Sequence, residues 1–361
     1  MHRYTATSLA ALLCMRKVQV SRSSQHTPAI LFWQFVSASN TCFKNMVSLP
    51  WTTLCLLATF AHADFYVSLN GSDAAAGTAH APFRSLERAQ KAVRGVKNTT
   101  DDDVRVYIAP GTYYLDQALL FTDLDSGNNG HKVVWEAQDM DKGVNISGGY
   151  HMTNWTLANI GRGIYSAPAP SGLKTRHFFA DQKHAQRAHH ALSRTWLASN
   201  TDGYWIVNDQ AEFLLTMEGL DQAEIHSLGS FTTRFSPISH AADNKTLVMK
   251  QPAWNNNGIG YDTISRPDVS HGFFVENALA LLDEENEWYL NTTSEIVYYK
   301  PPNGTDIRSM YLVLGSLEQL LVVGGTYDRP VHDITFKGFN YMHTTWSTYE
   351  NPTLLPHDMT I

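Results

Sequence analysis

Short candidate strands separated by compact polar turns dominate the chain from residue 65 to residue 149. Apolar and polar residues alternate over a few positions at a time, and Gly, Asn, Asp or Pro follow. This rhythm is typical of an all-β protein. Taken alone it leaves a β-sandwich, a propeller and a parallel β-helix open. The candidate strands are residues 65–69, 104–108, 119–122, 133–136 and 144–147, with a turn expected at 110–113.

One amphipathic helix is predicted before most of these strands. Ser85 is placed to cap it, and Leu86, Ala89 and Val93 recur at helical spacing. A helix at this place suits a parallel β-helix, because the open end of a solenoid must be covered. The short strands and tight polar corners also fit the three-stranded coil of that fold.

The pattern changes between residues 150 and 315, where strand candidates are unevenly spaced and separated by loops containing Trp and Pro. We interpret this region as an inserted β-rich accessory domain. The earlier rhythm returns at residues 320–323, 334–336 and 339–341, with Gly338 at the turn between the last two. The candidate strands of the middle region are residues 175–180, 203–207, 246–250 and 296–300.

A secretory signal is predicted at residues 46–63. The apolar run 54–61 has the length of a signal core and is too short to span a bilayer. Ala61-His62-Ala63 matches an A-x-A cleavage site, and Asp64 is the first acidic residue of the chain. We therefore expect a secreted, extracellular protein, with residues 1–45 an upstream extension translated in error. The alternative is a transit peptide, because residues 1–63 combine basic residues and many Ser, and residues 46–63 hold no Lys or Arg.

These patterns divide the remaining chain into three parts. Residues 64–149 are predicted to hold the N-terminal cap and the first β-helix coil, and residues 150–315 the inserted domain. Residues 316–361 are predicted to be resumed coils that end before a capping element, as expected of an N-terminal fragment.

Composition excludes several classes of chemistry. The three cysteines, Cys14, Cys42 and Cys55, all precede residue 64, so the predicted mature chain has no disulfide, Cys nucleophile or Cys-ligated metal. The formal net charge of -7 disfavours a nucleic-acid partner. No second apolar run is long enough for a membrane helix, so no stable membrane anchor is expected.

Seven Asn-x-Ser/Thr sequons follow the predicted cleavage site and none precedes it. This distribution fits a glycosylated secreted protein whose sequons lie in surface turns. The predicted glycosylation sites are Asn70, Asn98, Asn145, Asn154, Asn244, Asn291 and Asn303.

Several segments carry a family resemblance. The opening FYVSLNGSDAAAGTAHAPFRSLERAQKAV resembles the N-terminus of secreted right-handed parallel β-helix proteins with the pectin-lyase-like fold, and VRVYIAPGTYYL resembles their first coil. VENALALLDEENEWYLNTTSEIVYYKPPNGTDI and LEQLLVVGGTYDRPVHDITFKGFNYMHTTW are similar to large bacterial and fungal β-helix proteins related to carbohydrate-active enzymes.

The resemblance implies a right-handed parallel β-helix that acts on glycans, with a glycoside hydrolase of complex or cell-wall polysaccharide as the first expectation. The same fold also carries polysaccharide lyases and non-catalytic glycan-binding or surface proteins, and these remain the alternatives. No cofactor is expected.

Glycoside hydrolysis needs two carboxylates that face one bond. The resumed coils offer Asp333 and Asp328 as weak catalytic candidates, and solvated turn acids are the favoured interpretation of both. The resemblance implies that the reacting acids lie on later coils, so the catalytic residues stay unknown and this chain is expected to be inactive on polysaccharides.

Trp346 and His343 are the candidate substrate-binding residues. An indole face can stack on the apolar face of a sugar ring, and an imidazole can hydrogen-bond a hydroxyl. The alternative is that Trp346 packs a loop against the solenoid.

Two polar clusters are considered as metal sites, and no metal site is expected at either. His184, His189 and His190 lack metal-site spacing, and the resemblance implies a hairpin in which Arg187 is structural. The acid run 283–287 is interpreted as solvated, although calcium prefers clustered oxygen ligands. Residues 254–261 are interpreted as a surface turn, with a loop that lines a glycan groove as the alternative.

Overall fold

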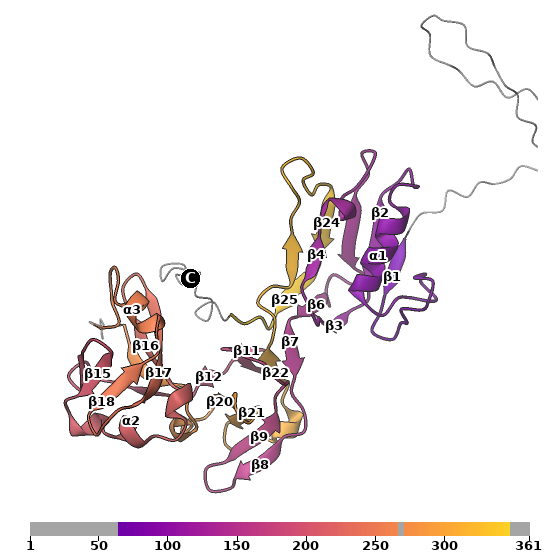
Figure 1. Cartoon of the computed structure of the whole chain (residues 1–361). Coiled ribbons are helices and arrows are strands. Elements are labelled where there is room, and N and C mark those ends of the chain that lie inside the picture. The colour runs from indigo at the N-terminus through magenta and orange to yellow at the C-terminus, as the bar shows by residue number, and fades with distance from the viewer. Residues whose placement is uncertain (1–63, 266–270, 347–361) are drawn as a thin grey trace, which may run out of the picture. The chain divides into compact units, whose positions relative to one another are not determined.

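The computed structural model describes residues 64–265 and 271–346 (Figure 1). The predicted upstream extension, the signal peptide, the three cysteines and residues 347–361 lie outside the described residues. The described part is mostly β-structure with few and mostly short helices, which confirms the predicted all-β class. None of its helices combines the length and the apolar character needed to cross a membrane.

Strands from the two ends of the described chain share three sheets, and every strand pair in these sheets is parallel. β24 lies beside β5 with Ile334 opposite Val133, and β25 lies beside β6 with Phe339 opposite Val144. The chain therefore leaves these sheets after β6 and returns to them with β23. The sheets contain β1 (Phe65–Val67), β2 (Val104–Ile108), β5 (Val133–Ala137) and β24 (Ile334–Lys337); β3 (Gly111–Tyr114), β6 (Val144–Ser147) and β25 (Phe339–Met342); and β4 (Leu119–Phe121) with β23 (Leu321–Val323).

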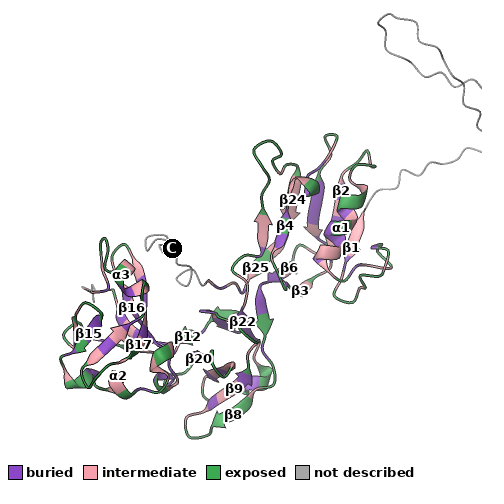
Figure 2. Ribbon diagram, viewed as in Figure 1, coloured by how far each residue is buried: buried purple, intermediate pink, exposed green. Residues whose placement is uncertain are grey.

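The predicted amphipathic helix is α1 (Leu86–Val96), and its start is the predicted one. Ser85 accepts a hydrogen bond from the backbone N–H of Arg88 at 3.2 Å, which satisfies a donor that has no partner within the helix. Leu86, Ala89 and Val93 are buried in one apolar cluster with residues of β1, β2, β5 and β6. The helix thus covers one side of the core formed by the parallel strands (Figure 2).

The turn predicted at residues 110–113 is wrong. Gly111–Tyr114 form β3, which pairs in parallel with β6 and places Thr112 opposite Asn145. The chain bends at Pro110, directly after the N–H of Ala109 donates to the carbonyl of Val67 at 2.9 Å and ends the pairing of β2 with β1. Gly111 has a φ of 148° and lies against Leu69, so the bend uses a backbone conformation that glycine tolerates.

The region between β6 and β23 is built mainly from antiparallel pairs, and it begins with β7 in a small sheet. The exception is the parallel pair of β12 and β20. The three sheets are β7 (Gly149–His151), β10 (Phe178–Ala180), β11 (Lys183–His184) and β22 (Leu312–Gly315); β8 (Thr156–Asn159), β9 (Ile164–Pro168), β12 (Gln186–Arg187), β20 (Glu287–Asn291) and β21 (Ile296–Lys300); and β13 (His189–Ala191), β14 (Leu197–Ser199), β15 (Gly203–Ile206), β16 (Glu224–Leu228), β17 (Thr233–Ala241), β18 (Thr246–Met249) and β19 (Phe273–Glu276).

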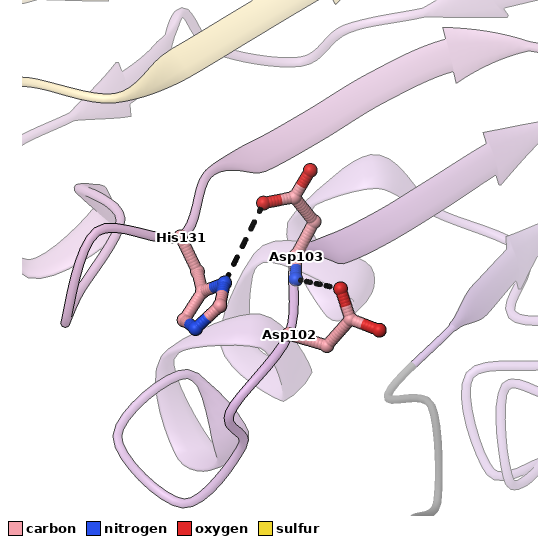
Figure 3. A group of neighbouring side chains, drawn as sticks. All are labelled: Asp102, Asp103 and His131. Carbon is pink, nitrogen blue, oxygen red and sulfur yellow. Dashed lines mark hydrogen bonds and ion pairs between the residues drawn. The ribbon is translucent and has the colours of Figure 1, made fainter.

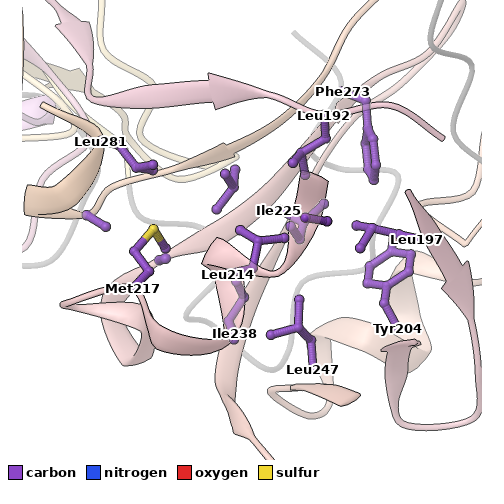
Figure 4. Close-up of a cluster of buried hydrophobic side chains, with 14 of the residues drawn as sticks. Leu192, Leu197, Tyr204, Leu214, Met217, Ile225, Ile238, Leu247, Phe273 and Leu281 are labelled. Atoms are coloured by element: carbon purple, nitrogen blue, oxygen red, sulfur yellow. The ribbon is translucent and has the colours of Figure 1, made fainter. Parts of the chain in front are cut away.

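The largest of these sheets has its own apolar core, which includes Tyr204, Leu214, Ile225 and Leu247 (Figure 4). Two short helices, α2 (Phe213–Thr216) and α3 (Ala253–Asn257), supply some of the buried side chains. A separate apolar core includes Trp288 of β20 and Tyr299 of β21. The middle region therefore does not depend on one continuous core. The short 3-10 helices are η1 (Asp123–Asp125), η2 (Asp209–Ala211), η3 (Leu220–Gln222), η4 (Leu279–Leu281) and η5 (Ile307–Ser309).

Two sequence interpretations in the middle region are corrected. Trp254 belongs to α3 rather than to a surface turn, and it is buried while its Nε1 donates to the carbonyl of Thr201 at 2.9 Å. Glu287 is only 1% exposed, whereas Asp283 and Glu284 are exposed. Glu287 accepts hydrogen bonds from the backbone N–H groups of Asp283 and Glu284, so the run folds around it instead of being fully solvated.

Candidate functional site

A cavity of about 350 Å³ lies at the point where β25 ends and the β10–β11 hairpin begins. The described residues that line it carry imidazole, aromatic, amide and thioether side chains and include no Asp, Glu, Lys or Arg. The lining residues are His177, Phe179, Gln182, His184, Tyr341, Met342, His343 and Thr344.

The hairpin that forms one wall follows from its turn residues. Asp181 and Gln182 both have positive φ, 49° and 67°, as a two-residue type I′ turn requires. The turn places His184 opposite Phe179 in the ladder, with ring centroids 4.4 Å apart. Asp181 also accepts the backbone N–H of Tyr311 at 2.9 Å through Oδ1, which fixes the turn against the residue before β22.

His343 is the most constrained residue of the cavity. It follows β25 with a φ of 62°, an uncommon conformation for a residue with a side chain, and it is only 3% exposed. Its Nδ1 lies 2.9 Å from the hydroxyl oxygen of Ser147, which ends β6. Its Nε2 is buried and has no hydrogen-bond partner among the described residues. A buried polar atom without a partner costs stability, so it marks a place where a water or a ligand group can bind.

His177 is oriented by the backbone that follows His343. Its Nδ1 lies 3.0 Å from the carbonyl oxygen of Thr344, so Nδ1 carries the proton and Nε2 is an acceptor when the ring is neutral. The His177 ring centroid lies 4.7 Å from that of His184, and Phe179 lies 4.8 Å from His343. The three imidazoles and Phe179 therefore form one continuous group.

The local environment keeps these imidazoles neutral near neutral pH. Burial lowers the pKa of His343 to about 4, and the charge of His184 adds to this effect. Burial also lowers the pKa of His177, partly offset by its hydrogen bond to the Thr344 carbonyl, and burial lowers the pKa of His184. The cavity thus presents neutral donors and acceptors beside an aromatic ring.

Trp346, the other predicted sugar-binding residue, is not part of the cavity lining. Its ring lies over the guanidinium of Arg176, with the carbon at 4.5 Å from the ring centroid, and 5.3 Å from the ring of Phe235. These contacts are with residues of the region 150–315, whereas the packing alternative for Trp346 named the solenoid. The structure therefore places the two predicted binding residues in different surroundings.

Arg176, which contacts the Trp346 ring, belongs to a buried cluster of charged residues. Arg176 and Arg187 each contact both Glu224 and Glu276, which are directly opposite each other on β16 and β19. Arg187 Nη1 lies 2.6 Å from Glu276 Oε1. Burial raises the pKa of Glu276, but Arg187 and the hydrogen bond from His226 outweigh it and hold that pKa below its usual range. The cluster has the contacts of a structural network, as the resemblance implies for Arg187.

The histidines considered for a metal site are separated by the fold. His184 belongs to the cavity, His189 lies 2.8 Å from the carboxylate of Glu287, and His190 packs against Phe213. Three residues of the cavity lining were not predicted from the sequence, namely His177, Phe179 and Gln182. The His-rich segment beside them was recognised, but alternation along one short hairpin does not indicate which distant residues the hairpin contacts.

The weak catalytic candidates lie in exposed positions. Asp333 has a φ of 53°, and its carboxylate lies 2.9 Å from Nδ1 of His332. Its carbonyl accepts the N–H of Val133 at 2.9 Å, so it forms a corner beside the preceding coil. Asp328 is exposed in the loop between β23 and β24. Neither residue lines the cavity.

Asp102, Asp103 and His131 bring three potential metal ligands within 4.8 Å of one another (Figure 3). Asp103 Oδ1 already accepts the N–H of Lys132 at 2.8 Å, and its Oδ2 lies 3.5 Å from Arg105. These contacts join the beginnings of β2 and β5. They explain the group as a structural contact between neighbouring strands.

The predicted glycosylation sites differ in exposure. Asn70, Asn98, Asn154, Asn244 and Asn303 are exposed, whereas Asn145 and Asn291 are half-buried. Asn145 lies within β6, where its Nδ2 donates to Thr112 at 3.3 Å and its Oδ1 accepts from Asn340 at 3.0 Å.

Comparison with solved structures shows a likeness in fold. One chain, described as a glycoside hydrolase, superposes with a TM-score of 0.66 at 24% sequence identity, covering 79% of this chain and 51% of that chain. This chain thus spans about half the length of that protein. A chain from the complex of XylC with xylose gives a TM-score of 0.36 at 15% identity, covering 79% of this chain and 36% of that chain.

No protein-family model matches the chain, and no curated protein matches it.

Proposed function

We propose that this chain belongs to a secreted, carbohydrate-active protein built on a right-handed parallel β-helix, and that its activity is of the glycoside hydrolase type. The three parallel sheets that β23, β24 and β25 rejoin support the solenoid, with residues 64–149 and 316–346 as its coils and residues 150–315 as the insertion. A right-handed connection is the strong preference for parallel strands. The fold likeness to a glycoside hydrolase supports the same assignment.

The observation that carries the proposal is the cavity around His343. Sugar rings combine an apolar face with hydroxyl groups that both donate and accept hydrogen bonds. The cavity offers Phe179 as an apolar surface, and Gln182 and neutral His177 as polar partners. The buried Nε2 of His343 lacks a partner among the described residues, and a sugar hydroxyl can supply one.

A non-catalytic glycan-binding protein is the second candidate. It is favoured by the absence of any carboxylate among the described residues that line the cavity, because hydrolysis needs two. A polysaccharide lyase remains a third possibility within the same fold. Secretion is supported by the A-x-A site before Asp64 and by the sequons after it.

A binding measurement tests the site. Secreted protein is titrated calorimetrically with a panel of cell-wall oligosaccharides, alongside His343→Asn, since Asn tolerates the left-handed backbone. We expect about tenfold weaker binding in the variant, which corresponds to loss of one good polar contact. Trp346→Ala is the comparison variant. Thermal unfolding of both variants is measured to check that each is folded. If Trp346→Ala abolishes binding while His343→Asn does not change it, the site has been assigned to the wrong residue.

A further inference from the structure

We propose that the His343 cavity selects neutral sugar units over uronic acids near neutral pH, and that it gains affinity for uronic acids when the medium is acidified. This inference rests on the proposed function, because it specifies the sugar class that the same cavity accepts. It also bears on the alternatives, because a lyase acts beside a uronate.

Fixed charge is absent from the described lining of the cavity. These residues include no Asp, Glu, Lys or Arg, so at neutral pH none of them carries a full charge. A carboxylate that enters such a cavity loses water and finds no counter-ion, which costs several kcal/mol unless it is paired. Neutral hydroxyl groups carry no such penalty when their hydrogen bonds are replaced.

Two permanent cations act on His177. Arg176 and Arg187 lie close enough to His177 to lower its pKa, but both are already bound to the buried carboxylates of Glu224 and Glu276. Drawing either arginine away would leave a buried carboxylate unpaired, which is strongly unfavourable. Neither arginine is therefore available as a uronate partner.

Other titratable groups lie on the elements that surround the cavity. Tyr341 lines the cavity, and burial raises its pKa, so it stays neutral. Tyr311 lies 6.0 Å from His343 and is in turn 5.0 Å from His151, measured between ring centroids. On β11, Lys183 precedes His184, so its side chain points to the opposite face. Asp181 is occupied by the N–H of Tyr311.

The three imidazoles of the cavity respond to acid together. His184 interacts electrostatically with both His177 and His343, so the three rings titrate as neighbours within one cavity. Because burial lowers their pKa values, they remain neutral at neutral pH and gain protons only as the pH falls. Each proton adds a cation to a lining that has no other charge, and a uronate then has a partner.

Matched tetrasaccharides test the inference. Calorimetric titrations of the full chain compare neutral tetrasaccharides from xylan, glucan, mannan and galactan with tetragalacturonate, at about pH 7.5 and about pH 4.5. The best neutral ligand is expected to bind at least tenfold more tightly than tetragalacturonate at the higher pH. Tetragalacturonate is expected to gain at least tenfold on acidification. Tighter binding of tetragalacturonate at the higher pH overturns the inference.

Two further outcomes separate the causes. No binding of any glycan at either pH overturns the proposed function itself. A neutral preference without an acid-induced gain overturns the role of the imidazoles. His184→Gln is expected to reduce the ratio of tetragalacturonate affinities between the two pH values at least threefold. His240→Gln, an exposed histidine on β17, is the matched control and should keep the ratio.

Discussion

At the scale of single residues, the clearest constraints come from polar groups that are buried together. Glu276 illustrates this, because two arginines and His226 surround it and its pKa is held below the ordinary value of 4.5. A carboxylate with a lowered pKa in the folded state contributes stability that is present above its ordinary pKa. That stability is lost as the pH falls through the lowered pKa.

We therefore predict that Glu276→Gln destabilises the protein by about 3–5 kcal/mol near neutral pH, because it breaks a buried ion pair. The variant should also lose less stability than the wild type between about pH 5 and about pH 2. Urea unfolding across this range measures both effects, with the exposed Glu285→Gln as control. An acid profile identical to that of the wild type would contradict the assigned role of Glu276.

The sequons give a second prediction at this scale. The side-chain amide of Asn145 is hydrogen-bonded between neighbouring strands, to Thr112 on one side and Asn340 on the other. A glycan on Nδ2 would replace one of its two amide hydrogens and would have to fit between the strands. We expect Asn145 to carry the lowest glycan occupancy of the sequons, and Asn70 and Asn154 high occupancy, as measured by glycopeptide mass spectrometry of secreted protein. Full occupancy of Asn145 in folded protein would be incompatible with this hydrogen-bonded arrangement.

At the scale of elements, α1 shows how a local signal and a tertiary contact combine. Ser85 caps the helix through Arg88 N–H and also donates its hydroxyl proton to Asp73 at 2.8 Å. Burial raises the pKa of Asp73, but hydrogen bonds from Ser85 and from the backbone N–H of Arg84 lower it overall. The cap thus ties the start of the helix to the loop that follows β1.

We predict that Ser85→Ala lowers the free energy of unfolding by about 1 kcal/mol, the usual value of an N-cap. Chemical denaturation measures this change. Thr153→Ala, at an exposed position, should stay within about 0.5 kcal/mol of the wild type. Equal stability of the two variants would show that the cap does not limit the stability of this part of the protein.

At the scale of the whole molecule, the central feature is the return of the chain to the sheets that it left. β5 is flanked by β2 from the N-terminal part and by β24 from the C-terminal part, so both ends depend on one strand. Trp135 on β5 is only 2% exposed and packs edge-on against Phe121 at 5.4 Å. Trp135 also lies opposite Phe336 of β24, so it links the two parts through one core.

We predict that Trp135→Ala lowers stability by about 3–5 kcal/mol through the cavity that it leaves. Trp205→Ala is the matched control, because Trp205 is 52% exposed in the insertion, and it should have a small effect. Denaturant unfolding followed by circular dichroism compares the two variants. A larger loss for Trp205→Ala would mean that the limiting core lies in the insertion.

The chain as given is predicted to bind glycans without cleaving them, because no carboxylate among the described residues lines the cavity. Incubation with cell-wall polysaccharides and analysis of released reducing ends measures this. If sugar is released, Asp333→Asn and Asp328→Asn become decisive, and loss of release in either variant would make that residue part of the reaction.

Features that depend on neighbours along the chain could be predicted from the amino-acid sequence. The start of α1 at Ser85 and the strands β2 and β6 follow from capping and from alternation, since both patterns report burial within a few residues. The strand β3 was mistaken for a turn because Pro110-Gly111 is turn chemistry, and only pairing with β6 makes Gly111–Tyr114 a strand.

The candidate site could not be predicted in this way, because it depends on contacts between distant parts of the chain. His343 reaches Ser147, and His177 reaches the carbonyl of Thr344, although more than a hundred and fifty residues separate the partners in each case. Alternation within a strand cannot specify such contacts, because they depend on which distant strand becomes the neighbour. The same holds for Glu287, whose acidic surroundings predicted solvent exposure but whose long-range contact with His189 accompanies its burial. Local chemistry fixed the elements, and the pairing of distant strands fixed which side chains meet.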